Sequence, residues 1–233
     1  GLIAPTVFTM LGSQALSTLS WKITLTLKCY FLTLSPAMVE QESSCMIHTP
    51  DVLLPPQDGP FSFAGAEFTL IHTPGHSPGH VCTVTPDGVC YLADAVLSHE
   101  LLGAKLPYNL SMAMCMESRE KLRGLPYDTY IMAHHGVCTG EELPHLIDEN
   151  QALIRTRAEE IRSLITHPMT SSQIDAAVCA YYQLFTHKPN RALRFERNIC
   201  FFVEYLVDSG LLEVRCRGGV ARYCPPSSKT ASQ

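Results

Sequence analysis

The sequence predicts a mixed α/β (α+β) fold with a small helical appendage at its C-terminal end. Three short segments rich in apolar and β-branched residues have the composition of strands, over 68–71, 91–93 and 130–133. A long amphipathic pattern over 141–166 predicts a helix, and the chain after it has the pattern of two more helices and a hairpin. Strands and helices combined in one chain give this fold class.

Length and composition are those of a globular protein. The 233 residues can bury one good core with room for an appendage. The formal net charge is −5, but residues 1–149 hold 6 Lys and Arg against 15 Asp and Glu, whereas residues 150–233 hold 11 against 7. The first part therefore carries −9 and the second +4. Solvated helix faces or a charged partner would explain this asymmetry, and we favour the solvated faces.

The ten cysteines contain no CxxC pair, so the sequence indicates neither a zinc ribbon nor a thioredoxin-like site. Cys82 and Cys90 flank a turn at residues 85–88. With a two- or four-residue loop they would lie on opposite faces of a hairpin, and no disulfide would join them. Most cysteines are therefore expected to be reduced and buried, which favours a cytoplasmic location.

Residues 1–49 are expected to form a separate N-terminal segment. Residue 1 is Gly rather than Met, so we expect a fragment or a processed product. Residues 2–20 are apolar but interrupted by Ser, Thr, Gly and Pro, and we expect no membrane span there. Alternating apolar and polar residues over Trp21–Leu34 predict a half-buried strand.

The run Phe68–His80, FTLIHTPGHSPGH, is the first candidate for a functional site. Its strand ends in a loop whose Pro and Gly residues exclude both helix and continued strand. The loop carries His72, His76 and His80, and imidazole is the commonest metal ligand among side chains. The alternative is that these histidines only satisfy nearby backbone groups.

Two later strands also end in residues that can bind metal. Asp94 follows the apolar segment 91–93, and His134, His135 and Gly136 follow 130–133. Strand ends at one edge of a sheet can converge in space, as metal and catalytic sites require. Gly136 suits a close backbone approach or a positive φ.

The helices have clear end signals. Apolar residues at helical spacing over 112–122 follow Ser111, a candidate N-cap, and precede Gly124, a candidate terminator. Thr170–Gln173 has the pattern of a capping box that opens a helix to about residue 184. A third helix is predicted over 192–209, and a hairpin over 214–223 with Gly218 and Gly219 in its turn.

These C-terminal elements resemble a small winged-helix element, which we assign to a helical appendage with a C-terminal β-hairpin over 151–233. The appendage carries six arginines that could meet phosphates: Arg191, Arg194, Arg197, Arg215, Arg217 and Arg222. Because glutamates interrupt this set, we favour packing on the core or a homodimer over nucleic-acid binding.

The motifs TPGHSPGH, LADAV and AHHG, in this order, resemble the second half of a metallo-β-lactamase-fold metallo-hydrolase, the superfamily that includes glyoxalase II. The resemblance covers about residues 50–224 and implies an αββα sandwich with its second half at 50–150. It implies His76, Asp94 and His135 as metal ligands, with Asp94 bridging two metals. His80 matches a position that usually supports the ligands, and His134 stands where the family often has Gly.

The resemblance also implies the chemistry. Two zinc ions, with iron or manganese as alternatives, would hold a hydroxide that hydrolyses an ester, thioester, amide or phosphoester of a small-molecule substrate. The catalytic residue of this chain would be Asp94, acting as the bridging ligand.

The chain departs from the family in its first half. The family's HxHxDH motif is absent from the 233 residues, and His48 stands alone in CMIHTPD. Three ligands are few for two metals, because zinc takes about four ligands. We therefore expect an incomplete sandwich with weak metal binding and poor hydrolysis, caused by truncation or by true loss of the motif. A second function class also stays open, a non-catalytic remnant or a nucleic-acid- or protein-binding module acting through the winged-helix-like part.

Overall fold

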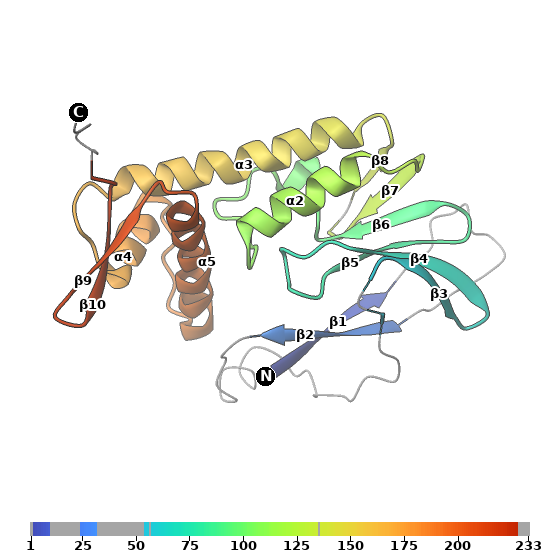
Figure 1. Cartoon of the computed structure of the whole chain (residues 1–233), viewed down its shortest axis with the longest axis horizontal. Coiled ribbons are helices and arrows are strands. Elements are labelled where there is room, and N and C mark those ends of the chain that lie inside the picture. Colours follow the sequence, from blue (N-terminus) through green and yellow to red (C-terminus); the bar gives the residue numbers. More distant parts are fainter. Residues whose placement is uncertain (1, 10–23, 32–53, 56, 135, 228–233) are drawn as a thin grey trace, which may run out of the picture.

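The computed structural model describes residues 2–9, 24–31, 54–55, 57–134 and 136–227 (Figure 1). Near the N-terminus, β1 (Leu2–Thr9) and β2 (Thr24–Phe31) pair as an antiparallel two-stranded sheet. Strand β2 confirms the central part of the strand predicted over 21–34. His48 lies outside the described residues.

The main sheet has six strands in the order β3-β4-β5-β6-β7-β8. Neighbouring strands are antiparallel except β6 and β7, which are parallel. The strands are β3 (Gly59–Phe63), β4 (Ala66–His72), β5 (Val81–Val84), β6 (Val89–Ala93), β7 (Thr129–Met132) and β8 (Val137–Thr139). The three strands predicted to end in candidate ligands are therefore confirmed as β4, β6 and β7.

The β5–β6 hairpin corrects one prediction. Cys82 and Cys90 lie on the same face, because Val84 pairs with Cys90 and side chains alternate along each strand. The turn contains a bulge: Thr85 N–H donates to the carbonyl of Val89, and Gly88 has a φ of 84°. A bulge of this kind adds one residue to the loop and so reverses the face that the following residues occupy. Both thiols are buried and unpaired.

Two helices cover one face of this sheet (Figure 1). They are α2 (Met112–Arg123), which follows the short 3₁₀ helix η1 (His99–Leu101), and α3 (Leu143–Leu164). Leu122 of α2 and Leu146 of α3 are fully buried against sheet residues such as Leu92. Each fully buried side chain of this size contributes about 1.5–3 kcal/mol, so these contacts fix the helices to the sheet.

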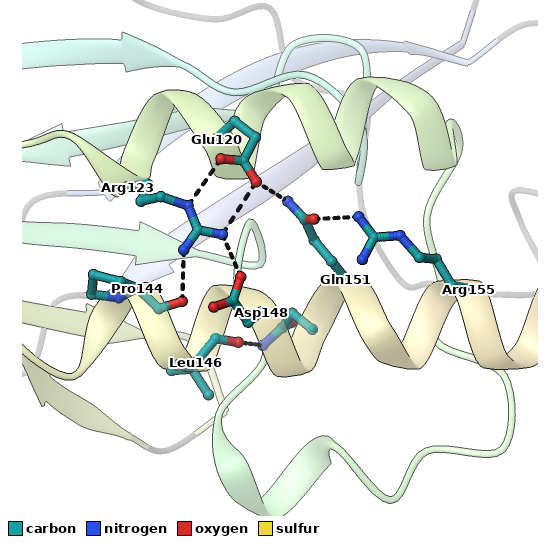
Figure 2. A network of polar contacts seen from close by, with 8 residues as sticks. Glu120, Arg123, Pro144, Leu146, Asp148, Gln151 and Arg155 are labelled. Carbon is teal, nitrogen blue, oxygen red and sulfur yellow. Dashed lines mark hydrogen bonds and ion pairs between the residues drawn. The ribbon is translucent and has the colours of Figure 1, made fainter.

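A polar network joins the outer surfaces of α2 and α3 (Figure 2). The Arg123 guanidinium donates to Glu120 on its own helix and, at 2.6 Å, to Asp148 on α3. Gln151 of α3 donates to Glu120 across 2.6 Å. Hydrogen bonding to Arg123 lowers the pKa of Glu120. Because the carboxylates of Glu120 and Asp148 are exposed to solvent, their ion pairs with Arg123 add little stability, and the network mainly aligns the two helices.

The C-terminal elements form a second core. They are α4 (Ser171–Tyr181), α5 (Pro189–Asp208) and the hairpin of β9 (Glu213–Arg217) and β10 (Val220–Cys224). Fully buried residues such as Ile161 of α3, Val178 of α4 and Phe202 of α5 meet here. The helix–helix–hairpin order of the appendage is confirmed.

The predicted helix ends are largely confirmed. The Ser111 side chain accepts from the Met114 N–H, and Gly124 ends α2. Thr170 and Gln173 form both hydrogen bonds of the capping box at the start of α4. Two bounds differ by three residues: α4 ends at Tyr181, before the predicted residue 184, and α5 begins at Pro189, before the predicted residue 192 and at a residue suited to the first helical turn.

One carboxyl group of α4 lies in an unfavourable environment. Burial raises the pKa of Asp175 to about 6, and the carboxylate of Glu196 on α5 adds to the shift. The native carboxyl thus binds its proton more tightly than the unfolded chain does. The stability that this group contributes is complete below about pH 4 and is lost as the pH rises through about 6.

Replacing Asp175 by Asn is therefore expected to stabilise the protein at pH 7.5 and not at pH 4. The full shift would correspond to roughly 3 kcal/mol, but partial exposure of Asp175 reduces the expected gain to about 1 kcal/mol. The midpoint of thermal unfolding at pH 7.5 should rise by about 2–4 °C. Exposed Asp128→Asn is the control, and an equal gain at both pH values would refute the explanation.

The mixed α/β fold class is confirmed. Helix α3 runs without a break across position 150, where we placed the border between the core and the appendage, and the division of the chain into domains stays a prediction. None of the described helices is long and apolar enough to cross a membrane.

Candidate functional site

Strand order brings the three candidate strand ends to one edge of the sheet. Strand β5 is antiparallel to both β4 and β6, so β4 and β6 run in the same direction, and β7 is parallel to β6. The carboxyl ends of β4, β6 and β7 therefore lie at the same edge. The loop that carries His76, the residue Asp94 and the chain after Met132 all start from there, which fulfils the condition for the strand ends to converge.

The loop after β4 is clamped by the start of α2. Ser118 donates to the carbonyl of Pro74 at 2.7 Å, and the Ser111 N–H donates to the carbonyl of Gly75 at 3.0 Å. Gly75 has a φ of 142°, and a Cβ there would lie 2.6 Å from the backbone nitrogen of Cys115. Only glycine fits this approach, and it places His76 next to the helix start.

The His76 ring has a defined orientation. Its Nδ1 lies 3.2 Å from the carbonyl oxygen of Tyr108, and the two rings meet edge to face with centroids 5.3 Å apart. A carbonyl only accepts hydrogen bonds, so the Nδ1 of His76 carries the proton. The Nε2, which keeps its lone pair in the neutral ring, lies 3.9 Å from Oδ2 of Asp94. This arrangement is the one that metal-binding histidines usually have.

Asp94 lies between two histidines. Besides the contact with His76, its Oδ1 is 3.5 Å from Nε2 of His134. The side chains of His76, Asp94 and His134 are 30%, 19% and 71% exposed, so the carboxylate is shielded while His134 stands at the rim. His134 has a φ of 57°, a conformation that glycine adopts more easily.

His80 supports Asp94 through the backbone. The Asp94 N–H donates to Nε2 of His80 at 3.2 Å, so Nδ1 carries the proton and donates to the Thr73 hydroxyl at 2.8 Å. Thr73 in turn contacts the Cys82 thiol at 3.3 Å, and this thiol donates to the carbonyl of Leu92. The chain of hydrogen bonds thus runs from Asp94 back to β6 and fixes the end of the strand at the turn that carries Asp94.

His80 is 5% exposed, and this burial lowers its pKa to about 3, with nearby His76 acting in the same direction and a hydrogen bond with Thr73 opposing it. The imidazole is therefore neutral at physiological pH. A neutral ring has one donor and one acceptor, and both are used in this chain of hydrogen bonds.

The segment after Asp94 is held by two buried side chains. Arg119 of α2 is 1% exposed and donates from Nε to the carbonyl of Ala95 at 2.8 Å. Asn150 of α3 accepts from the Leu97 N–H at 2.8 Å and donates to the Leu97 carbonyl at 2.9 Å. Buried polar groups lose free energy unless they are paired, so these bonds lock the path of the chain around the site.

The segment after β7 is tightly packed where it is described. Gly136 has a φ of 142°, and a Cβ there would lie 2.8 Å from Cβ of Ser98. The prediction that Gly136 suits a close backbone approach or a positive φ is confirmed. His135, the third predicted metal ligand, lies outside the described residues.

The structure separates His72 from the other histidines of its loop. Its Nε2 lies 2.9 Å from the carbonyl of Pro55, and its N–H donates to Asp58 at 2.8 Å. Asp58 also pairs with Lys121 of α2 at 2.6 Å. For His72 the alternative of a purely structural role therefore fits the contacts.

Four supporting residues were not identified from the sequence: Thr73, Tyr108, Arg119 and Asn150. Thr73 and Tyr108 act through a short hydroxyl contact and a main-chain carbonyl, which leave no pattern in a sequence. Asn150 did leave a signal, because it interrupts the apolar stripe of α3 and is 1% exposed. A buried amide among apolar neighbours indicates a hydrogen-bonding task.

The donor set suits a metal ion in its chemistry. A neutral imidazole with its free nitrogen toward a carboxylate offers the N and O ligands that zinc, iron and manganese accept. Within the described ranges, however, no three His, Cys, Asp or Glu side chains lie close enough together to hold an ion. His76 and Asp94 therefore form part of a possible site, and the described contacts do not complete it.

Comparison with known proteins agrees with the motifs. The family model of the Metallo-beta-lactamase superfamily matches residues 34–134. A hydroxyacylglutathione hydrolase from Rhizobium meliloti is 31% identical over 103 residues, which are 43% of this chain and 39% of that protein. The chain thus spans well under half the length of this relative.

Two solved structures share the fold. A metallo-beta-lactamase family protein from Thermus thermophilus has a TM-score of 0.58 at 21% identity, over 77% of this chain and 56% of its own. A beta-lactamase domain protein from Burkholderia ambifaria has the same TM-score at 19% identity, over 77% and 54%. The chain therefore has a metallo-β-lactamase fold, its residues 34–134 match the model of the metallo-β-lactamase superfamily, and a segment of it is similar to a hydroxyacylglutathione hydrolase (glyoxalase II).

Proposed function

We propose that this chain is a metal-dependent hydrolase in which His76, Asp94 and His135 bind the metal. The observation that carries the proposal is the geometry at Asp94, where the free nitrogen of an oriented His76 points to a shielded carboxylate. Zinc is the metal we favour, with iron or manganese as alternatives, and a complete site would hold two ions. A bound metal would supply an activated water and polarise the scissile group of an ester, thioester, amide or phosphoester.

The residues of the chain have separate tasks in this proposal. Asp94 provides negative charge at the centre, and His80 keeps its backbone in place through the 3.2 Å bond to the Asp94 N–H. His134 contacts the open side of Asp94 and would meet a small-molecule substrate there. The match to the superfamily supports hydrolysis as the type of reaction. The similarity to a hydroxyacylglutathione hydrolase supports a thioester only as one of the substrate types named above.

We also propose that the 233-residue chain alone binds metal weakly and has low activity. The HxHxDH motif is absent from its sequence, and the three proposed ligands leave two metals with too few donors. The eight cysteines from Cys82 to Cys224 are unpaired, which supports a reducing, cytoplasmic location.

Metal content of the purified chain tests this proposal. After saturation with zinc and gel filtration, we expect clearly less than one equivalent by elemental analysis, and less again in His76→Ala. Two tightly held equivalents, lost in His76→Ala, would contradict weak binding and show that other residues complete the site. Equal zinc in both proteins would contradict the role of His76.

The second candidate function is a binding module built on the C-terminal part. Arg215 pairs with Glu213 at 3.0 Å, and the guanidinium of Arg191 lies over the Phe195 ring. These contacts of Arg215 and Arg191 leave less arginine charge to attract phosphates. We therefore place packing, or contact with a second copy of the chain, ahead of nucleic-acid binding.

A further inference from the structure

The segment 104–109, between the Asp94 loop and α2, is held by the C-terminal helices. Arg157 of α3 donates to the carbonyl of Ala104, and Lys105 donates to the carbonyl of Tyr182, the residue after α4, at 2.8 Å. Asn198 of α5 donates to the carbonyl of Leu106 at 3.1 Å, across 92 positions of sequence. All three C-terminal helical segments therefore contribute a contact to these few residues.

A further contact of α5 leads to the candidate site. The Phe201 ring of α5 meets the Tyr108 ring edge to face, with centroids 6.0 Å apart. Tyr108 is the residue whose carbonyl accepts from Nδ1 of His76 and whose ring lies against the His76 ring. Phe201, Tyr108 and His76 thus form a continuous row of rings from α5 to the metal-ligand candidate.

The segment is also anchored at its other end. Asn109 is 2% exposed and accepts a hydrogen bond from the Cys115 thiol of α2 at 2.9 Å. Cys115 is the residue against which Gly75 packs. The position of the Tyr108 carbonyl is therefore determined by α2 on one side and by α5 on the other.

We propose that α5 is a positioning element for His76: through Asn198 and Phe201 it holds the segment 106–108, and this segment sets the ring orientation and tautomer of His76. The inference rests on the proposed function, because it gives the appendage a task at the same site. Without these contacts the Tyr108 carbonyl would move and would no longer keep the proton of His76 on Nδ1. The Nε2 of His76 would then carry the proton in part of the molecules and could not bind a metal in them.

Two neighbouring phenylalanines of α5 allow a matched test. Phe201 is partly buried and touches Tyr108, whereas Phe202 is fully buried in the second core. Phe202→Leu is expected to lower the midpoint of thermal unfolding by about 3–6 °C, because it removes core contacts. Phe201→Leu should cost less stability and yet disturb His76 more.

Zinc affinity is the first readout, measured by competition with a chromogenic chelator on the full chain. We expect Phe201→Leu to weaken zinc binding by about tenfold or more, as is usual when a supporting contact of a ligand is removed. Phe202→Leu should bind zinc as the unmodified chain does. Asn198→Leu serves as a second variant, because it removes the bond to Leu106 without touching the ring row.

The second readout needs no metal. Nitrogen-15 NMR of the histidine rings at alkaline pH, where the rings are neutral, reports which ring nitrogen is protonated, and His76→Gln assigns the signal. In the unmodified chain we expect the Nδ1–H form of His76, and in Phe201→Leu and Asn198→Leu a mixture of both forms. If the unmodified chain binds no zinc, the proposed function fails, while the NMR result still decides this inference. An unchanged His76 tautomer in both variants would refute it.

Discussion

Replacing Asp94 by Ala is expected to lower zinc affinity by more than about hundredfold, since even loss of a residue that only supports a ligand costs about 10–100-fold. In a form of the protein with measurable hydrolysis, activity should fall by orders of magnitude. Among the described residues, Asp94 is the carboxylate that lies within 4 Å of both His76 and His134, and its removal leaves two imidazoles without this shared partner. Isothermal titration of zinc into the metal-free protein measures the loss.

Two control variants separate charge from structure. Asp94→Asn keeps the side-chain shape and the N–H bond to His80, and it should also lose most zinc affinity because the negative charge is gone. Asp87→Ala lies on the exposed β5–β6 turn and should bind zinc as the unmodified chain does. If Asp94→Ala retained full affinity, the assignment of the site would be wrong.

The sequence predicted the elements of the site but not their order in space. Each candidate ligand follows a strand, and the runs of apolar residues before His72 and Asp94 predicted these strands. Helix ends could also be predicted from the sequence, because capping depends on residues close in sequence, such as Ser111 and Thr170. These features are local, and local patterns are the part of a fold that a single sequence records best.

The pairing of strands that lie far apart in the sequence could not be predicted in the same way. That β5 runs between β4 and β6 decides whether the three strand ends meet, yet no residue of β5 indicates it. The bulge at Gly88 turned Cys90 to the face of Cys82, because one extra residue changes the face of every residue that follows. The contacts of Arg119 and Asn150 with main-chain carbonyls likewise depend on distances that only the folded chain fixes.

Replacing Gly75 by Ala is expected to destabilise the protein more than any other single methyl addition at a described glycine. The added Cβ would lie 2.5–2.7 Å from the Sγ, N and Cα atoms of Cys115, and two of these belong to the backbone at the start of α2. The thiol could rotate away, but the helix backbone could not. The φ of 142° adds strain, because residues with a Cβ rarely adopt it.

Overpacking and backbone strain each cost about 1–3 kcal/mol, so Gly75→Ala should lose about 3 kcal/mol or more. The midpoint of thermal unfolding should then fall by about 6–12 °C for a chain of this size. Gly103→Ala is the matched control, because its Cβ would meet no atom within 4 Å. If the loop instead moved away from α2 to accept the methyl group, stability would change little while His76 lost its contact with Tyr108. Thermal unfolding and zinc titration of the same variant therefore distinguish a rigid clamp from an adaptable loop, and the backbone contacts to Cys115 favour the clamp.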